Sequence, residues 1–141
     1  MRINRKGEFP GFPGSADNFT GDVTFTDVYL TDKPGRIVGG TVQFEAGART
    51  HWHSHPFGQI LIVTEGTGWT QCEGEERVEI RKGDIVTCPS DVRHWHGATS
   101  TTGMTHIAVA EGIDGAYADW QEPVTDEQYL SGPVDQSPSV P

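Results

Sequence analysis

Cysteine is scarce in this chain of 141 residues, and Cys72 and Cys88 are too few for a disulfide framework. We interpret both as free thiols in a reducing compartment. No apolar run approaches the length that crosses a membrane, and no apolar stretch of a signal peptide follows the basic residues near Met1. These absences predict a cytoplasmic protein without a membrane partner.

Positive charge is also scarce. The sequence has 10 Lys and Arg residues against 20 Asp and Glu residues, which gives a formal net charge of −10. Nucleic acids are bound largely through Lys and Arg contacts to phosphates, so this excess of acidic residues argues against a nucleic acid partner. We expect a small molecule as the partner instead.

Long helical patterns are absent, whereas turn residues are frequent, with 18 glycines and 9 prolines. Short apolar or alternating segments lie between the turns. We expect strands over 23–30, 37–44, 48–55, 59–64, 69–73, 77–80, 84–87, 94–98 and 104–110. Many short strands with almost no helix predict an all-β sandwich or barrel.

The two ends of the chain differ from this central part. Residues 1–21 are rich in glycine, proline and phenylalanine, and we interpret them as a strand-free arm that packs on the barrel or on a neighbouring subunit. Residues 22–132 form one domain with a C-terminal extension, in which 119–130 is the one candidate helix. The composition of residues 133–141 predicts a disordered tail.

Histidines provide the main chemical signal. His53 and His55 lie two positions apart on one expected strand, so their side chains point to the same face. Gln59 opens the next strand with a neutral amide oxygen, and His94 comes from a separate strand pair. Three imidazoles and one amide oxygen suit one divalent ion (Mn, Fe, Co, Ni or Zn) and leave positions for water or substrate.

The spacing of these residues matches the two motifs of the cupin family. The first motif, G-x5-H-x-H-x3-E-x6-G, covers residues 47–66, with Gln59 in place of the usual Glu. The second, G-x5-P-x-G-x2-H-x3-N, covers 83–98, with Asp91 in place of Gly and Ala98 in place of Asn. The resemblance implies an antiparallel jelly-roll (cupin) β-barrel with a short C-terminal helix or coil.

A narrower resemblance links the chain to small bacterial cupins, which include relatives of carboxymuconolactone decarboxylase and the manganese-dependent (R)-hydroxynitrile lyases. It rests on the segments 47–59, 94–98, 104–106 and 120–129. The resemblance implies one divalent ion per chain, with Mn(II) expected. It assigns the ligand role to His53, His55, Gln59 and His94. It also implies a homodimer or homotetramer.

His106 matches the acid/base histidine of those lyases. An ordinary histidine pKa lies near neutrality and suits proton transfer, although a buried structural histidine is the alternative interpretation. Thr50 is a second candidate catalytic residue, as a hydrogen-bond donor at the pocket, and an ordinary strand threonine is its alternative. We interpret His51 and His96 as neighbours of the ligands or residues of the rim.

The sequence therefore indicates a metal-dependent enzyme, and the narrower resemblance implies hydroxynitrile lyase chemistry, the cleavage or synthesis of cyanohydrins from an aldehyde and HCN. A +2 ion with neutral ligands stabilises a developing anion. Two alternatives stay open. One is another cupin enzyme, such as an iron dioxygenase or an isomerase of small carbonyl compounds. The other is a non-catalytic cupin that binds a small molecule without turnover.

Overall fold

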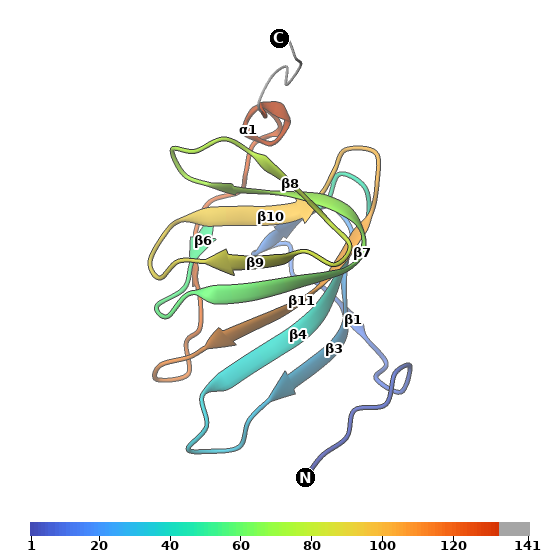
Figure 1. Ribbon diagram of the computed structural model, residues 1–141, viewed down its shortest axis with the longest axis vertical. Coiled ribbons are helices and arrows are strands. Elements are labelled where there is room, and N and C mark those ends of the chain that lie inside the picture. Colours follow the sequence, from blue (N-terminus) through green and yellow to red (C-terminus); the bar gives the residue numbers. More distant parts are fainter. Residues whose placement is uncertain (133–141) are drawn as a thin grey trace.

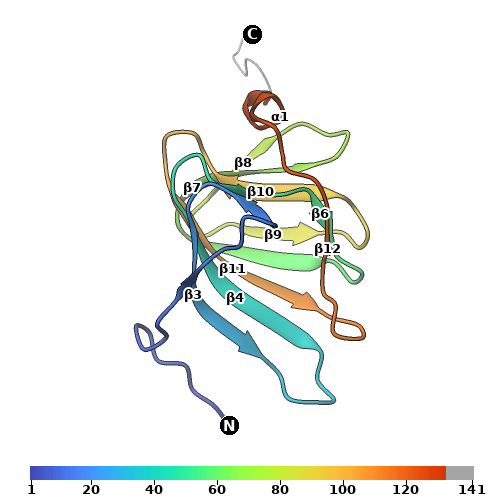
Figure 2. The same ribbon diagram turned by 180° about the vertical axis from the view of Figure 1, so that it is seen from behind.

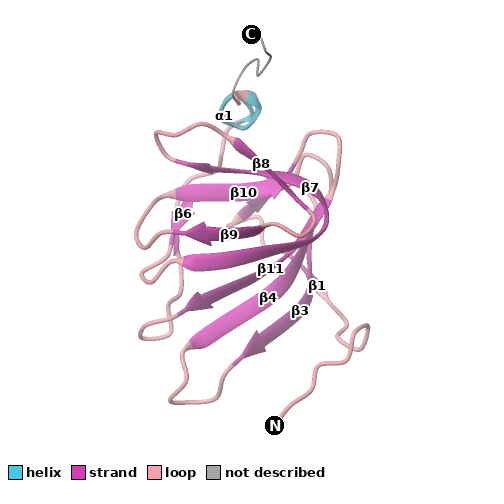
Figure 3. Ribbon diagram, viewed as in Figure 1, coloured by secondary structure: helices cyan, strands magenta, loops and turns pink. Residues whose placement is uncertain are grey.

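The computed structural model describes residues 1–132, and in this part of the chain 12 strands precede one short helix, α1 (Asp126–Leu130) (Figure 1). The strands are β1 Phe12–Pro13, β2 Phe19–Thr20, β3 Val23–Leu30, β4 Ile37–Phe44, β5 Arg49–Thr50, β6 His53–Ser54, β7 Gln59–Cys72, β8 Val78–Arg81, β9 Ile85–Cys88, β10 His94–Ala98, β11 Met104–Glu111 and β12 Asp119–Trp120. Every pairing between them is antiparallel. The predicted antiparallel β-barrel with a short C-terminal helix is confirmed (Figure 3). The predicted tail, 133–141, lies outside the described residues.

Strand β7 belongs to two sheets. Its first half pairs with β9 and β11, and β11 continues the sheet through β4 to β3. Its second half pairs with β8 and β10. The sequence predicted two separate strands here, 59–64 and 69–73, and this prediction is wrong. Gly66 keeps the strand continuous because its φ of 75° is open to glycine and lets the backbone bend.

The expected strand over 48–55 is interrupted, and only β5 and β6 of it are regular. The interruption has a cause in backbone pairing. The amide of His51 donates to the carbonyl of Asn18 at 2.8 Å, and the amide of Trp52 donates to the carbonyl of Glu122 at 3.0 Å. Residues 51 and 52 therefore bond to the two terminal segments and not to a neighbouring barrel strand.

The N-terminal arm is not strand-free, which corrects the interpretation of residues 1–21. β1 pairs with β3 at one end of the sheet order, and β2 pairs with β5 at the other end. Figure 2 shows the arm running across the barrel between these two edges. Phe19 lies in the hydrophobic core, where its side chain is only 8% exposed. The arm therefore covers otherwise open edges of both sheets.

The C-terminal extension contains less helix than the candidate range 119–130. β12 pairs with β6, and α1 begins only after Thr125. Pro123 disfavours a helical conformation at the residue before it, which accounts for the late start. Thr125 and Gln128 form a capping box that satisfies the first turn.

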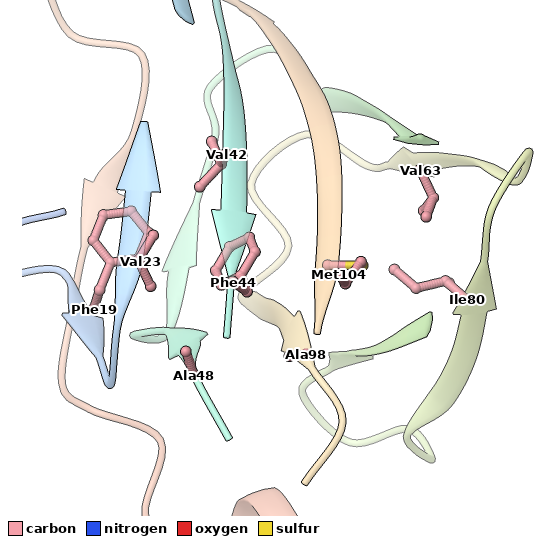
Figure 4. Close-up of a cluster of buried hydrophobic side chains, with 9 residues drawn as sticks. All are labelled: Phe19, Val23, Val42, Phe44, Ala48, Val63, Ile80, Ala98 and Met104. Atoms are coloured by element: carbon pink, nitrogen blue, oxygen red, sulfur yellow. The ribbon is translucent and has the colours of Figure 1, made fainter. Parts of the chain in front are cut away.

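Two hydrophobic clusters stabilise this arrangement. The larger one lies between the sheets and contains Phe19, Val23, Val42, Phe44, Ala48, Val63, Ile80, Ala98 and Met104 (Figure 4). The smaller one joins α1 to the barrel and contains Trp52, Trp95, Val124 and Tyr129. The hydroxyl of Tyr129 donates to the carbonyl of Ala98 at 2.6 Å, which fixes the helix on β10. Within residues 1–132 no helix is long and apolar enough to cross a membrane.

Candidate metal centre

Two short segments bring the predicted ligand histidines together. β6 pairs with β10 so that His53 lies directly opposite His94. The centroids of these two rings are 4.4 Å apart, and the ring of His55 lies 4.9 Å from His53 and 5.3 Å from His94. A turn at Gly58, with a φ of 79°, then leads into β7, where Gln59 faces the interior. The local sequence thus places four donor groups at one end of the barrel.

Backbone carbonyls orient the three rings. The Nδ1 atom lies against a carbonyl oxygen at 2.9 Å for His53, 2.8 Å for His55 and 3.1 Å for His94. A carbonyl only accepts hydrogen bonds, so each Nδ1 carries the proton and each Nε2 keeps a free lone pair. This is the tautomer in which a histidine ligates a metal through Nε2.

Several buried polar atoms at this end have no hydrogen-bond partner within residues 1–132. Three of them are predicted ligand atoms, namely Nε2 of His55, Oε1 of Gln59 and Nε2 of His94. Leaving such an atom unpaired costs about 1–3 kcal/mol, and a coordinated cation offsets that cost. The residues present therefore fit a divalent metal ion.

The tightest cluster of donor atoms includes a histidine outside the predicted ligand set. Ligand atoms of His53, His94 and His96 all lie within 4.8 Å of one another, whereas His55 lies outside this group. Three imidazoles at such spacing are a metal site of the kind that binds divalent transition ions. His53 and His94 belong to both donor sets, and His55 with Gln59 is the alternative to His96.

His96 was interpreted from the sequence only as a neighbour or rim residue. The structure buries it and places its Nδ1 atom 3.0 Å from Nε2 of His106. The signal for its inward position was present in the alternation of His94 and His96, the same pattern that identified His53 and His55. A histidine that faces the same side of a strand as a metal ligand is not thereby shown to be a ligand itself.

Burial keeps these histidines neutral. It lowers the pKa of His94 and of His106 to about 4, and it lowers the pKa of His53 and His96 well below the ordinary value. The pKa of His55 is lowered in the same way, and the carbonyl of Tyr117 offsets part of the effect. At neutral pH the site therefore offers uncharged imidazoles, the form that a metal requires.

A cavity of about 370 Å³ opens beside the histidines. His53, His55, Gln59, His96 and His106 line it, whereas His94 is not part of its wall. Most of the other lining groups are apolar, from Val28, Val38, Val42, Phe44, Ala108 and Ala110. The cavity therefore combines a group of histidines with a largely apolar lining that suits an apolar group.

Thr50 also lines the cavity and is almost fully buried. Its Oγ1 accepts a hydrogen bond from the backbone amide of His96 at 3.2 Å. The hydroxyl hydrogen is not used in that bond and can be donated to a ligand. The structure thus brings Thr50 and His106, the two candidate catalytic residues, to the same cavity as three of the expected metal ligands, His53, His55 and Gln59.

Two cavity residues were missed by the sequence analysis. Trp120 lies opposite His53 in the pairing of β12 with β6, and its ring is 4.5 Å from that of His53. Tyr117 lines the cavity with its side chain and accepts a hydrogen bond from His55 with its carbonyl. Both lie in the C-terminal extension, where Trp120 opens the segment 120–129 of the narrower resemblance but neither residue was assigned to the site.

The fold and the histidine cluster define the class of the protein. Residues 40–110 match the family described as Cupin domain, and the chain belongs to this family. Over 129 residues it is 50% identical to the (R)-mandelonitrile lyase of Granulicella tundricola, an alignment that covers 92% of this chain and 98% of that protein.

Solved structures agree with this assignment. A cupin-like protein from Thermotoga maritima is 42% identical, with a TM-score of 0.78 over 92% of this chain and 95% of its own. A second protein of that organism, described as a predicted oxalate decarboxylase, is 21% identical, with a TM-score of 0.66 over 77% of this chain and 96% of its own. The latter similarity shows the fold alone.

Proposed function

We propose that this cupin is a metal-dependent lyase of the hydroxynitrile type, which cleaves cyanohydrins to an aldehyde and HCN or forms them in reverse. The observation that carries the proposal is the 50% identity to an (R)-mandelonitrile lyase over 92% of the chain. The cavity supports it because neutral donor groups meet an apolar space of small-molecule size. The substrate is accordingly a small molecule.

We propose His53, His55, Gln59 and His94 as the ligands of one divalent ion, with Mn(II) as the expected metal. Nε2 of His55 and Oε1 of Gln59 are buried without a partner within residues 1–132, as this set requires, and Nε2 of His96 is unpartnered as well. The contact of His96 with His106 favours a different role for His96. A bound divalent ion in this set of neutral ligands would supply positive charge for the anion that develops as the carbon–carbon bond breaks.

The proton transfer is assigned to His106. Its neutral ring takes the proton of the cyanohydrin hydroxyl, the carbon–oxygen bond becomes a carbonyl, and the bond to the nitrile carbon breaks. The released cyanide then takes the proton and leaves as HCN. Thr50 lies at the same cavity and donates its free hydroxyl hydrogen to the substrate oxygen. Ala108 and Ala110 leave space for the substrate on this wall.

We also propose that two or four copies assemble, through the outer face of the sheet that contains β9. The register aligns its apolar side chains on the side opposite the cavity: Ile60, Ile62, Ile85, Ile107 and Val109. Ile60 is 45% exposed and Ile85 is 67% exposed. Exposed aliphatic side chains grouped on one face of a sheet are candidates for an interface, and a second copy of the same face would cover them.

The decisive experiment measures mandelonitrile cleavage by the Mn-loaded protein, with benzaldehyde release followed by absorbance and the metal content by elemental analysis. We expect turnover without oxygen, which excludes a dioxygenase. Full metal occupancy without turnover would discard the lyase proposal and make oxygen uptake by the iron-loaded protein the next measurement. Binding of benzaldehyde without any reaction would favour a non-catalytic cupin.

A further inference from the structure

We propose that the N-terminal arm forms the outer wall of the substrate pocket and that Phe12 is a specificity-determining residue. In this role Phe12 contacts the part of the substrate that is remote from the metal-binding histidines. The identity of the substrate rests on the proposed function, whereas the existence of the wall rests on the contacts of the arm.

The position of Phe12 is fixed by strand pairing. β1 pairs with β3 so that Phe12 lies opposite Phe25, and the two rings stack with centroids 5.0 Å apart and an angle of 7° between their planes. Phe12 lines the cavity and yet is 45% exposed. A ligand can therefore cover a part of this side chain that the protein itself leaves uncovered.

Phe12 begins a continuous series of aromatic contacts that ends at the metal centre. The ring of Phe25 meets that of Phe19 edge to face at 5.7 Å, and Phe19 lies 5.6 Å from Trp120. Trp120 in turn lies 4.5 Å from the ring of His53. All of these residues line the cavity. One wall is thus aromatic from the outer surface to a predicted ligand.

The chemistry of this wall selects for a flat apolar group. Apart from Ser15, Asn18 and Tyr117, the polar side chains that line the cavity are Thr50, Gln59 and the histidines. We therefore place the reacting atoms of a ligand at the histidines and the remainder along the aromatic wall. Aromatic rings pair in offset or edge-to-face geometry, and such pairs are worth about 0.5–1.5 kcal/mol beyond the area they bury. We therefore expect an aryl substituent to gain binding free energy from contact with Phe12, and a short alkyl substituent to gain less.

The experiment compares two cyanohydrins, mandelonitrile and lactonitrile, in Mn-loaded Phe12→Ala and Phe12→Leu. We expect kcat/KM for mandelonitrile to fall about fivefold to tenfold in Phe12→Ala, mainly through KM, and less in Phe12→Leu. For lactonitrile we expect a change below about twofold. The control is Phe9→Ala. The ring centroids of Phe9 and Phe12 are 6.0 Å apart, and Phe9 does not line the cavity. The Phe9→Ala variant should therefore keep its kcat/KM for both cyanohydrins.

Equal losses for both substrates in Phe12→Ala would show that Phe12 only holds the arm in place, and they would overturn the proposal. Unchanged kcat/KM for both mandelonitrile and lactonitrile in Phe12→Ala would overturn the proposal as well. A second readout is the binding of benzaldehyde, measured by quenching of tryptophan fluorescence, since Trp120 lines the pocket. We expect at least about fivefold weaker binding in Phe12→Ala than in the unaltered protein.

The binding measurement separates this inference from the proposed function. If the protein binds benzaldehyde through Phe12 but cleaves no cyanohydrin, the lyase proposal fails and the aromatic wall stands. If mandelonitrile is cleaved and neither its KM nor benzaldehyde binding depends on Phe12, the wall proposal fails alone.

Discussion

Nδ1 of His96 and Nε2 of His106 lie 3.0 Å apart, and both side chains are buried. Burial lowers the pKa of both histidines, so the pair is neutral at pH 7 and one ring donates while the other accepts. The contact fixes the orientation of His106 relative to the metal-binding residues. His96 is therefore a positioning residue for His106 in the proposed reaction.

The first prediction concerns His106→Ala. Loss of the acid/base group should lower kcat for mandelonitrile by about 10²–10⁴-fold, with the Mn content unchanged because His106 is not a proposed ligand. Steady-state kinetics together with elemental analysis of the same sample test this. A variant that loses its metal together with its activity would instead show that His106 supports the metal site.

The second prediction separates the two possible donor sets. We expect His55→Ala to lower the affinity for Mn at least about 100-fold, because removal of even an outer-shell partner typically costs 10–100-fold. His96→Ala should bind Mn with little change, because His96 faces His106. Titration with Mn(II), followed by electron paramagnetic resonance of the free ion, measures both affinities. The reverse order of effects would assign the site to His53, His94 and His96.

The third prediction concerns the stability of the metal-free protein at acid pH. The folded-state pKa of His94 and His106 is about 4, below the ordinary value of 6.5, so the unfolded state binds more protons between these pH values. Stability should be full above pH 6.5 and fall as the pH drops towards 4. The slope is about 1.4 kcal/mol per pH unit for each such histidine.

Urea unfolding at a series of pH values measures this slope, and His106→Gln provides the comparison. The variant has one buried histidine fewer, so its stability should fall less steeply over the same range. An identical slope in the two proteins would mean that His106 is not kept neutral by folding.

The fourth prediction uses two glycines with similar backbone angles. Gly66 has a φ of 75°, and an added Cβ would collide with the carbonyl oxygen of Gly103. Gly74 has a φ of 84° with open space around it. Gly74→Ala should cost about 1–2 kcal/mol from the left-handed backbone alone. Gly66→Ala should cost at least about 1 kcal/mol more, since backbone must shift. Chemical denaturation of both variants tests the difference.

The fifth prediction concerns assembly. Ile85→Lys places a charge on the edge strand β9 of the exposed aliphatic face without touching the cavity, which lies on the other side of the sheet. We expect the variant to sediment as a monomer and to keep the metal site, whereas the unaltered protein sediments as a dimer or tetramer. Unchanged sedimentation would place the interface, if the protein has one, on a different face.

Much of the barrel could be predicted from the sequence because its strands follow local rules. Val23–Leu30, Ile37–Phe44 and His94–Ala98 have the bounds that the pattern of apolar residues and turns predicts. The failures occurred where distant segments decide the backbone. The interruption at His51 and the short strand β2 depend on partners about 30 residues away, and β1 depends on its pairing with β3, none of which periodicity reveals.

The candidate site divides in the same way. Spacing within a motif identified His53, His55 and Gln59 as a local group, and the structure gathers them at one cavity. The approach of His96 to His106 depends on how two strands face each other across the barrel. Trp120 and Tyr117 reach the cavity from an extension whose path is set by pairing with β6. Such contacts require the fold to be known.

The division of β7 between two sheets has a consequence for motion. Gln59 lies at one end of this strand, and Cys72 at the other end lies opposite His94 in β10. An ion held by Gln59 and His94 would connect the first residue of β7 to the strand that pairs with its last residue. Opening of one hairpin would therefore leave one of these two ligands in place. Fraying at one edge of the barrel would then not free such an ion. Exchange of the ion with solvent would require the hydrogen bonds of both sheets to open at the same time. The exchange rate would therefore measure how often the whole barrel opens transiently.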